Sequence, residues 1–234
     1  MEVGQNPMTL TRVATLFVRD NPLRQEFKTA FAQYRTTSAP VTLTLIWIVT
    51  AVFAVEVALT VLFGVRSIRV FATGLFKLYP ELAWLFAPVL HAGLGHFLVN
   101  IGCLLTVGIP LELQFTNRRF GIFLLATAYF STVGGLVAKA VFTTTPIAVY
   151  GISGTVFALA GYALIHFARS SEHLTAFEWV ALLVGFAAAT TVAVDFFTGP
   201  YLHPEWINGG HATGFMIGVL VGEWRYGCPE ITEI

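Results

Sequence analysis

The chain has 234 residues, of which 56% are hydrophobic and only 11% are charged, an imbalance too large for a soluble domain with about 25% charged residues. Thirteen basic residues balance thirteen acidic ones, so the net charge gives no indication of a nucleic-acid partner. We therefore expect a polytopic α-helical membrane protein whose surrounding solvent is largely the lipid bilayer.

Residues 1–40 are polar and mixed in charge, and we expect them to form a cytosolic extension that contains no secretory signal. One marginal amphipathic stretch, Thr9–Tyr34, lies within it. The membrane domain is predicted over residues 41–226, because the segments between its apolar blocks are too short for a second folded domain. Residues 227–234 form a C-terminal tail.

Apolar blocks follow in chain order, and a helix needs about 20 apolar residues to cross the hydrocarbon core. The fourth block is shorter than a full crossing, so its N-terminal end is expected below the membrane surface. The predicted fold is all-α, a bundle of six transmembrane helices, with spans at Val41–Leu62, Leu94–Leu113, Phe120–Phe142, Ile152–Phe167, Phe177–Phe197 and Gly209–Trp224.

The distribution of basic residues predicts the orientation. With both termini in the cytosol, nine of the 13 basic residues lie inside and four outside, which agrees with the excess of Lys and Arg in cytoplasmic segments. Residues 64–93 hold many aromatic side chains among few charges, a composition typical of a loop in the outer interface. Residues 198–208 contain two prolines and are expected to form a Pro-broken loop on the same side.

Strongly polar side chains inside apolar blocks are costly in a bilayer and therefore indicate function. His96 and Asn100 share one face of the second span because they are four residues apart. Ser153 begins the fourth span and His211 lies near the start of the sixth, so all four are expected at a similar depth on the outer side. Each alone has an ordinary interpretation as a packing or buried residue, but their coincidence predicts a site.

The surroundings of Ser153 suit nucleophilic chemistry. It lies in Gly151-Ile-Ser-Gly-Thr155, where glycines allow a turn and the close approach of other backbone. At a helix N-terminus the unpaired N–H groups can stabilise a developing oxyanion, and a histidine can activate the hydroxyl as a general base. Small residues at three- and four-residue spacings on two spans predict the close contact that this requires: Gly154, Ala158 and Gly161, and Gly214, Gly218 and Gly222.

Taken together, these residues resemble the rhomboid family of intramembrane serine proteases. The patterns His91-x4-His96-x3-Asn100, Gly151-x-Ser153-Gly154 and His211-x2-Gly214 stand in the family's order on the second, fourth and sixth spans, and the resemblance covers about residues 41–226. It implies that Ser153 is the nucleophile and His211 its general base. It also implies an oxyanion hole formed by His96, Asn100 and the Ser153 backbone N–H.

The resemblance further implies a set of residues that shape the site: Gly151, Gly154, Phe157, His91 and Gly214. Glu112, at the end of the second span, resembles a structural glutamate of the family, although an interfacial helix-end charge is an equal interpretation. The implied activity is hydrolysis of peptide bonds in or near transmembrane segments of substrate proteins, with the site towards the outer side. A small residue before the scissile bond, and substrate access near the fifth span under residues 198–208, are also implied.

Three positions depart from the family pattern. Phe157 stands where a tyrosine is common, Gly210 stands where an alanine is common, and Trp84 and Arg69 replace an adjacent Trp-Arg pair. None of these departures removes a catalytic atom, so activity is still expected. We expect no metal or organic cofactor, because two distant cysteines, Cys103 and Cys228, do not form a thiolate site. The sequence indicates neither an oligomeric state nor a role for Asp195.

Other classes of protein fit the sequence less well. A zinc-dependent intramembrane protease needs His-Glu-x-x-His, and no histidine here precedes a glutamate. An aspartyl protease needs two membrane aspartates, whereas Asp195 is the only aspartate outside the N-terminal extension. Thr155 removes the Gly-x-Ser-x-Gly pattern of soluble hydrolases. The alternative left open is a catalytically inactive rhomboid-like protein that binds transmembrane segments for trafficking or degradation; a small-solute transporter is less favoured, because no internal repeat is visible.

Overall fold

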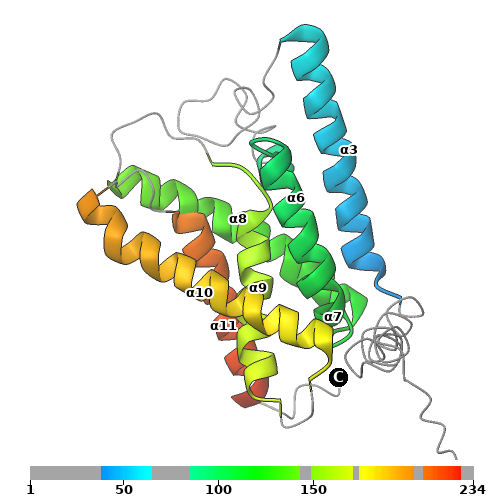
Figure 1. The fold of residues 1–234 in the computed structure, drawn as a ribbon, viewed down its shortest axis with the longest axis vertical. Coiled ribbons are helices and arrows are strands. Elements are labelled where there is room, and N and C mark those ends of the chain that lie inside the picture. The colour runs from blue at the N-terminus through cyan, green and yellow to red at the C-terminus, as the bar shows by residue number, and fades with distance from the viewer. Residues whose placement is uncertain (1–37, 65–84, 143–148, 171–173, 203–207, 228–234) are drawn as a thin grey trace, which may run out of the picture. The chain divides into compact units, whose positions relative to one another are not determined.

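The computed structural model describes residues 38–64, 85–142, 149–170, 174–202 and 208–227. Every regular element within these ranges is a helix (Figure 1), which confirms the predicted all-α class. All of them belong to the unit Ala39–Ile234, while the unit Met1–Ser38 lies outside the described residues except for Ser38. The elements are α3 (Pro40–Phe63), η1 (Ala87–Val89), α6 (Leu94–Cys103), η2 (Leu104–Gly108), α7 (Ile109–Glu112), α8 (Asn117–Phe142), α9 (Ser153–Ala168), α10 (Ala176–Leu202) and α11 (Gly209–Gly227).

Helix α3 has clear signals at both ends. Pro40 occupies its first turn, where a fixed φ and a missing N–H suit the helix, and Gly64 ends it in the left-handed conformation with a φ of 65°. The buried carboxylate of Glu112 accepts hydrogen bonds from the N–H groups of Val41 and Thr42, both at 2.8 Å. It thereby satisfies two donors that have no partner within the helix, which supports the structural interpretation of this glutamate.

The second predicted span is one continuous helical run made of α6, η2 and α7. Its middle section, Leu104–Gly108, is a π-helical turn, a wider turn that usually marks an inserted residue or a local constraint. Pro110 follows directly in α7 and has no N–H to donate to the preceding turn. The helical run therefore has nearly the predicted length, from Leu94 to Glu112, but its helical pitch changes in the π-helical turn at Leu104–Gly108.

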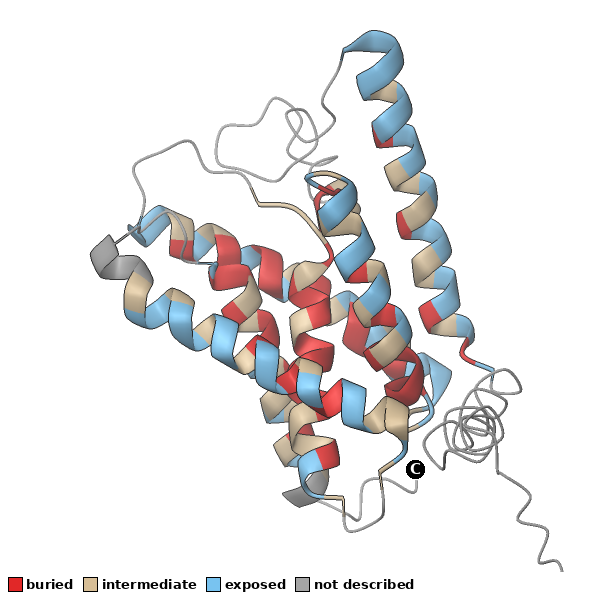
Figure 2. Cartoon of the chain, viewed as in Figure 1, coloured by how far each residue is buried: buried red, intermediate tan, exposed pale blue. Residues whose placement is uncertain are grey.

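Helix α9 forms the centre of the bundle. Its residues Leu159, Tyr162 and Ala163 are at most 1% exposed, and Figure 2 shows the buried residues concentrated on α9 and on the helix faces turned towards it. α9 has only 16 residues, yet other helices surround it, so it does not need to match the full thickness of the hydrocarbon core. This agrees with the predicted shortness of the fourth span.

The outer helices present apolar surface away from this centre. Among the residues that the structure describes, four helices are long and apolar enough to cross a membrane: α3, the run Leu94–Glu112, α8, and α10 over Ala176–Thr198. Only 11% of the most apolar 18-residue stretch of α3 is buried within the protein, and the Trp47 side chain of this helix is 75% exposed. Exposed apolar side chains of this extent suit a lipid environment rather than water.

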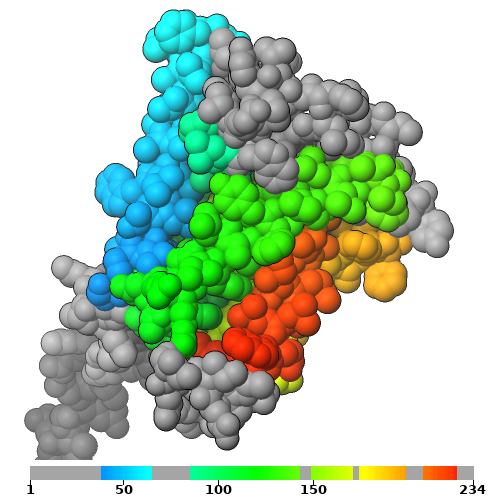
Figure 3. All heavy atoms as spheres, turned by 180° about the vertical axis from the view of Figure 1, so that it is seen from behind, coloured from blue at the N-terminus to red at the C-terminus, as the bar shows by residue number. Residues whose placement is uncertain are grey.

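Close packing of α9 against α11 depends on glycine. A Cβ on Gly214 would collide with the carbonyl oxygen of Gly154, and one on Gly218 would collide with that of Ala158. The predicted contact between two small-residue faces is therefore confirmed. α11 also lies along α8 (Figure 3), so its first turn is held between two helices.

The structure corrects the expected end of the fifth span. α10 continues through Pro200 to Leu202, so residues 198–202 are helical and do not belong to a Pro-broken loop. A proline within a helix removes one hydrogen bond and crowds the preceding turn, but here the helix ends only two residues later. Residues 203–207 of the predicted loop, and residues 65–84 of the predicted interfacial loop, lie outside the described residues.

Candidate active site

Ser153 and His211 meet at the N-terminal ends of two neighbouring helices. Ser153 is the first residue of α9, and His211 lies in the first turn of α11. The Oγ of Ser153 lies 2.9 Å from Nε2 of His211, which is hydrogen-bond distance for a hydroxyl and an imidazole. Two residues separated by 58 positions in the sequence thus form the pair that a nucleophile and its base require.

The backbone before Ser153 is shaped by Gly151. Its φ is +106°, a region that residues with a Cβ rarely adopt. Its N–H donates a 2.7 Å hydrogen bond to the carbonyl of Ala87 in η1, and a Cβ at this position would lie 3.0 Å from Cε1 of His96. Glycine is therefore required both for the turn into α9 and for the close approach of the histidine.

An aromatic contact holds the His211 ring, and a glycine next to Ser153 allows close packing at the site. The Phe157 ring, one turn into α9, stacks on the imidazole with centroids 4.0 Å apart and 7° between the planes. Gly154, directly after Ser153, leaves room for Ser131, because a Cβ on Gly154 would collide with the Ser131 side chain. Phenylalanine thus provides a stacking surface for the imidazole without a hydroxyl that could bond to it.

His96, on α6, turns one ring nitrogen towards the same space. The N–H of Ala92 donates to Nδ1 of His96 at 3.4 Å, so in the neutral ring the proton belongs on Nε2. His96 and Gly151 line one cavity together with Ser153 and His211. The Nε2–H group is therefore a donor available to that cavity.

Asn100 lies one helical turn further along α6 than His96. It is 2% exposed, and its Nδ2 group has no hydrogen-bond partner among the described residues. A buried amide with no bonded partner there keeps its capacity to donate a hydrogen bond. Asn100 is nevertheless absent from the residues that line the cavity, so it is close in sequence to the site but is not part of the cavity wall.

His91 was expected to line the cavity, and the structure places it elsewhere. The residue is 2% exposed and lies behind the cavity, against the rings of Phe53, Phe97 and His96. Its backbone N–H donates to the buried carboxylate of Glu56 at 3.0 Å. Burial lowers the pKa of His91 to about 4, and the positive form of nearby His96 lowers it further, because neither a low dielectric nor a second cation favours imidazolium.

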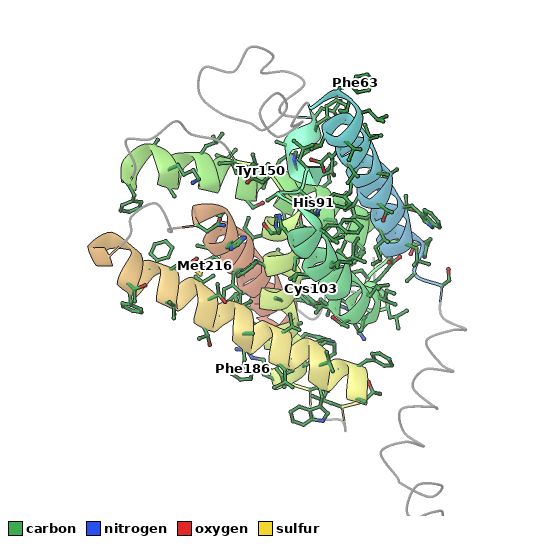
Figure 4. All side chains as sticks on the ribbon, turned by 45° about the horizontal axis from the view of Figure 1, so that its top comes forward. Phe63, His91, Cys103, Tyr150, Phe186 and Met216 are labelled. Atoms are coloured by element: carbon green, nitrogen blue, oxygen red, sulfur yellow. The ribbon has the colours of Figure 1, made fainter. Side chains whose placement is uncertain are left out.

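The cavity at the centre of these residues has a volume of about 240 Å³, enough for several water molecules. Its walls come from α6, α8, α9 and α11 and from the segment before α9. Ser131, Lys139 and Tyr150 contribute polar groups. Figure 4 shows His91 and Tyr150 at the same end of the helix bundle, with Phe186 of α10 towards the other end.

Three residues at or near the site were not singled out from the sequence. Asn208 and Ser131 line the cavity, while Glu56 holds the segment before α6 through the His91 N–H. Asparagine is a preferred residue directly before a helix, so Asn208 had a recognisable signal. Glu56 had one as well, since it is the only acidic residue in the first apolar block.

No group of three or more His, Cys, Asp or Glu side chains in the described ranges is arranged to hold a metal ion. The residues that line the cavity offer a hydroxyl, an imidazole and several hydrogen-bond donors. Such a set is suited to acyl transfer, in which the hydroxyl attacks a carbonyl and donors stabilise the resulting oxyanion.

Comparison with known proteins matches residues 80–226 to the family model described as "Rhomboid domain". "RHOMBOID-like protein 1" of Arabidopsis thaliana is 34% identical over 137 residues, which cover 57% of this chain and 31% of that protein. "Rhomboid-related protein 2" of Mus musculus is 32% identical over 153 residues, covering 60% of this chain and 49% of the relative. "Rhomboid-related protein 1" of Caenorhabditis elegans is 34% identical over 165 residues, which cover 64% of this chain and 43% of that protein. The chain thus spans less than half the length of each of these relatives.

Proposed function

The chain belongs to the rhomboid family and is an integral membrane protein, and from this premise we propose that it is an intramembrane serine endopeptidase. Ser153 is the nucleophile and His211 the general base. The observation that carries the proposal is the 2.9 Å contact between Ser153 Oγ and His211 Nε2, at the wall of a cavity large enough for several water molecules. An inactive protein would have no need to keep a hydroxyl and an imidazole in this relation.

The first half of the reaction forms an acyl-enzyme. His211 Nε2 takes the proton of the Ser153 hydroxyl as Oγ attacks the substrate carbonyl, and the imidazolium then gives that proton to the leaving amine. A serine without a base is a poor nucleophile at neutral pH. In the second half, water from the cavity attacks the acyl group, with His211 again as the base.

Donors around Ser153 stabilise the negative oxygen of the tetrahedral intermediate. α9 has no side-chain cap, and its first intrahelical bond runs from the N–H of Val156 to the carbonyl of Ile152. The preceding N–H groups, including that of Ser153, are therefore free to donate. His96 adds its Nε2–H from across the cavity, and each donor of this kind contributes on the order of 3 kcal/mol to the transition state.

Asn100 is the third donor implied by the family pattern, beside His96 and the Ser153 N–H. Its buried and unsatisfied Nδ2 supports a role as a donor, but it does not line the cavity. In the proposed mechanism, Asn100 therefore acts only when the substrate or a water molecule occupies the space between α6 and α9.

The substrates in this proposal are transmembrane proteins, cleaved in or near a membrane-spanning helix. A helical peptide bond must first unwind, because its carbonyl is hydrogen-bonded and shielded. Access is proposed near α10, because α10 packs only slightly against α11, whereas α9 packs extensively against α11. A weakly packed helix can separate from its neighbour more easily to admit a substrate. A cross-link between α6 and α10 should therefore abolish cleavage of a transmembrane substrate, and unchanged cleavage would contradict lateral access.

The decisive experiment is cleavage of a transmembrane model substrate by purified protein in liposomes. Wild type should cleave, whereas Ser153→Ala and His211→Ala should each reduce kcat by at least about 10⁴-fold. A fluorophosphonate probe should label wild type but not Ser153→Ala. Gly102→Ala serves as a control, since a Cβ at Gly102 would contact nothing within 4 Å.

A second function remains the competing outcome of that experiment. If a broad panel of substrates stays intact and the probe does not label Ser153, the protein is a non-catalytic rhomboid-like protein that binds transmembrane segments. The observation that favours this outcome is Phe157, which stacks on His211 without the hydroxyl common in the family.

A further inference from the structure

Asn208 contacts the proposed base twice, through two different atoms. It precedes α11 directly, and its backbone carbonyl accepts a 3.1 Å hydrogen bond from the N–H of Ala212, the first bond of the helix. Its side-chain Oδ1 accepts a 3.1 Å hydrogen bond from the N–H of His211. Asn208 is therefore the N-cap of α11.

The cap determines which way the Asn208 amide faces. A backbone N–H can only donate, so the atom that accepts from the His211 N–H must be the oxygen and not the nitrogen of the amide. The Nδ2 group consequently lies on the other side, 3.1 Å from Nε2 of His211. That Nε2 is the same atom that lies 2.9 Å from Ser153 Oγ.

An amide NH₂ is a donor only, so this contact is favourable only when Nε2 carries no proton. A neutral histidine has two tautomers, and the serine hydroxyl alone does not choose between them, because a hydroxyl both donates and accepts. The Asn208 amide makes the choice. With its proton on Nδ1, the imidazole presents the Nε2 lone pair to both Nδ2 and the Ser153 hydroxyl.

We propose that Asn208 is a positioning residue that holds His211 in the Nδ1-protonated tautomer, so that Nε2 is ready to accept the proton of Ser153. The inference rests on the proposed function for its catalytic meaning, but not for the tautomer itself. Among the described residues no carboxylate is bonded to His211, and the amide supplies the orientation that a carboxylate on Nδ1 supplies elsewhere. It acts from the opposite side of the ring, by excluding the wrong tautomer.

Other titratable groups near His211 also affect its protonation. His96 of α6, Lys139 of α8 and Tyr150 before α9 line the same cavity. α9 contributes the Ser153 hydroxyl and the uncharged Phe157 ring. Asp195 of α10, the other helix in contact with α11, is absent from the cavity wall. These groups are unchanged when Asn208 is substituted, so a difference between variants reports on the amide.

The test uses three substitutions that separate the cap from the amide. Asn208→Asp keeps a good cap and replaces the donor that faces Nε2 with a carboxylate oxygen. Asn208→Ser also keeps a cap oxygen but leaves nothing opposite Nε2. Asn208→Ala removes both functions, and its thermal unfolding in detergent measures what the cap alone contributes.

The first readout is the pH profile of kcat/KM for cleavage. A carboxylate favours the protonated imidazole, so Asn208→Asp should move the acidic limb to higher pH by about one unit or more and lower the rate at neutral pH about tenfold. Asn208→Ser should move the limb less, in the same direction. Both should unfold at nearly the wild-type temperature. An acidic limb at the wild-type pH in Asn208→Asp, or activity losses that merely follow thermal stability, would overturn the proposal.

The second readout needs no catalysis. Nitrogen NMR of ¹⁵N-histidine-labelled protein distinguishes a protonated from an unprotonated ring nitrogen, and the spectrum of His211→Gln assigns the signal. Wild type should show an unprotonated Nε2 and a protonated Nδ1, and Asn208→Ser should show a mixture. A wild-type His211 with its proton on Nε2 would overturn the inference. If no variant cleaves any substrate but the spectra behave as described, the proposed function fails while the role of Asn208 stands.

Discussion

At the scale of single residues, Ser153 and His211 meet because each lies in the first turn of its own helix. Their positions depend little on flexible side chains: α9 and α11 are in contact through glycine, and Phe157 stacks on the imidazole. Ordering a side chain by packing before the substrate arrives removes an entropic cost from the reaction. The same argument makes Gly151 essential, since its positive φ sets the turn that presents Ser153.

His91 illustrates a different use of histidine, as a buried neutral group with a predictable pH dependence. Its pKa of about 4 in the folded protein lies below the value of about 6.5 expected in the unfolded chain. Between these values the unfolded state binds a proton that the folded state does not, so stability falls as the pH falls through this window. At pH 5 the loss should be about 2 kcal/mol relative to pH 7.

This prediction is checked by the free energy of unfolding in detergent at pH 7 and pH 5. His91→Gln and His91→Phe both remove the titrating group, and each should lose less stability than wild type over that interval. The difference between wild type and variant isolates His91 from the other histidines. An equal fall in all three proteins would show that His91 is not the group responsible.

At the scale of helices, the contact between α9 and α11 is the packing on which the site depends. A Cβ on Gly218 would collide with the carbonyl oxygen of Ala158 and lie 2.9 Å from the N–H nitrogen of Tyr162. Both obstacles are backbone atoms within a helix, so the two helices would have to separate. We expect Gly218→Ala to destabilise the protein by about 3 kcal/mol and to reduce cleavage even where the protein is still folded.

Gly102→Ala is the matched control for that substitution. Gly102 also lies within a helix, but a Cβ there would meet nothing within 4 Å, and alanine is a better helix former than glycine. Its thermal stability in detergent should equal or slightly exceed that of wild type. Similar losses in both variants would indicate a general intolerance of alanine and would remove the argument from close packing.

The sequence predicted most of the helices because apolar length and spacing are local properties. The first, third and fourth spans begin and end within three residues of α3, α8 and α9. It did not predict the π-helical turn at Leu104–Gly108 or the continuation of α10 through Pro200, since both depend on packing by neighbouring helices. A propensity describes what a segment prefers alone, and tertiary contacts can outweigh it.

For the site, too, the sequence predicted what depends on helical spacing and missed what depends on contacts between distant segments. Helical spacing correctly brought His96 and Ser153 to one cavity, because residues at fixed depths on adjacent helices must lie near one another. It did not show that His91 turns away among Phe53 and Phe97, because the segment before α6 has no periodicity to fix its direction. Asn208 had the local signal of a helix cap, but its contact with the His211 ring depends on tertiary structure that no local pattern predicts.

At the scale of the whole molecule, the two ends of the bundle differ in chemistry. The cavity lies at the N-terminal end of α9, whereas Arg169 follows its C-terminal end and pairs with Glu223 at 2.7 Å. Arg225 donates to the Tyr162 hydroxyl at that same end. α8 runs between the ends, with Arg118 and Arg119 in its first turn and Lys139 beside the cavity. Four arginines are thus gathered at the end opposite Ser153.

This asymmetry predicts that both termini are cytosolic and that the cavity opens towards the outer side. Basic residues near the ends of spans are retained in the cytoplasm. The C-terminal end of α9 and the N-terminal end of α8 carry the arginines, and α11 finishes at this same end of the bundle. Green fluorescent protein fused after residue 234 should therefore fluoresce, whereas alkaline phosphatase fused after residue 145, between α8 and α9, should be active. Replacing Arg118 and Arg119 by alanine should weaken this orientation, while replacing Lys139 should not. The opposite pattern of reporters would place Ser153 on the cytosolic side, and substrates would then have to present their cleavage sites to the protein from within the cell.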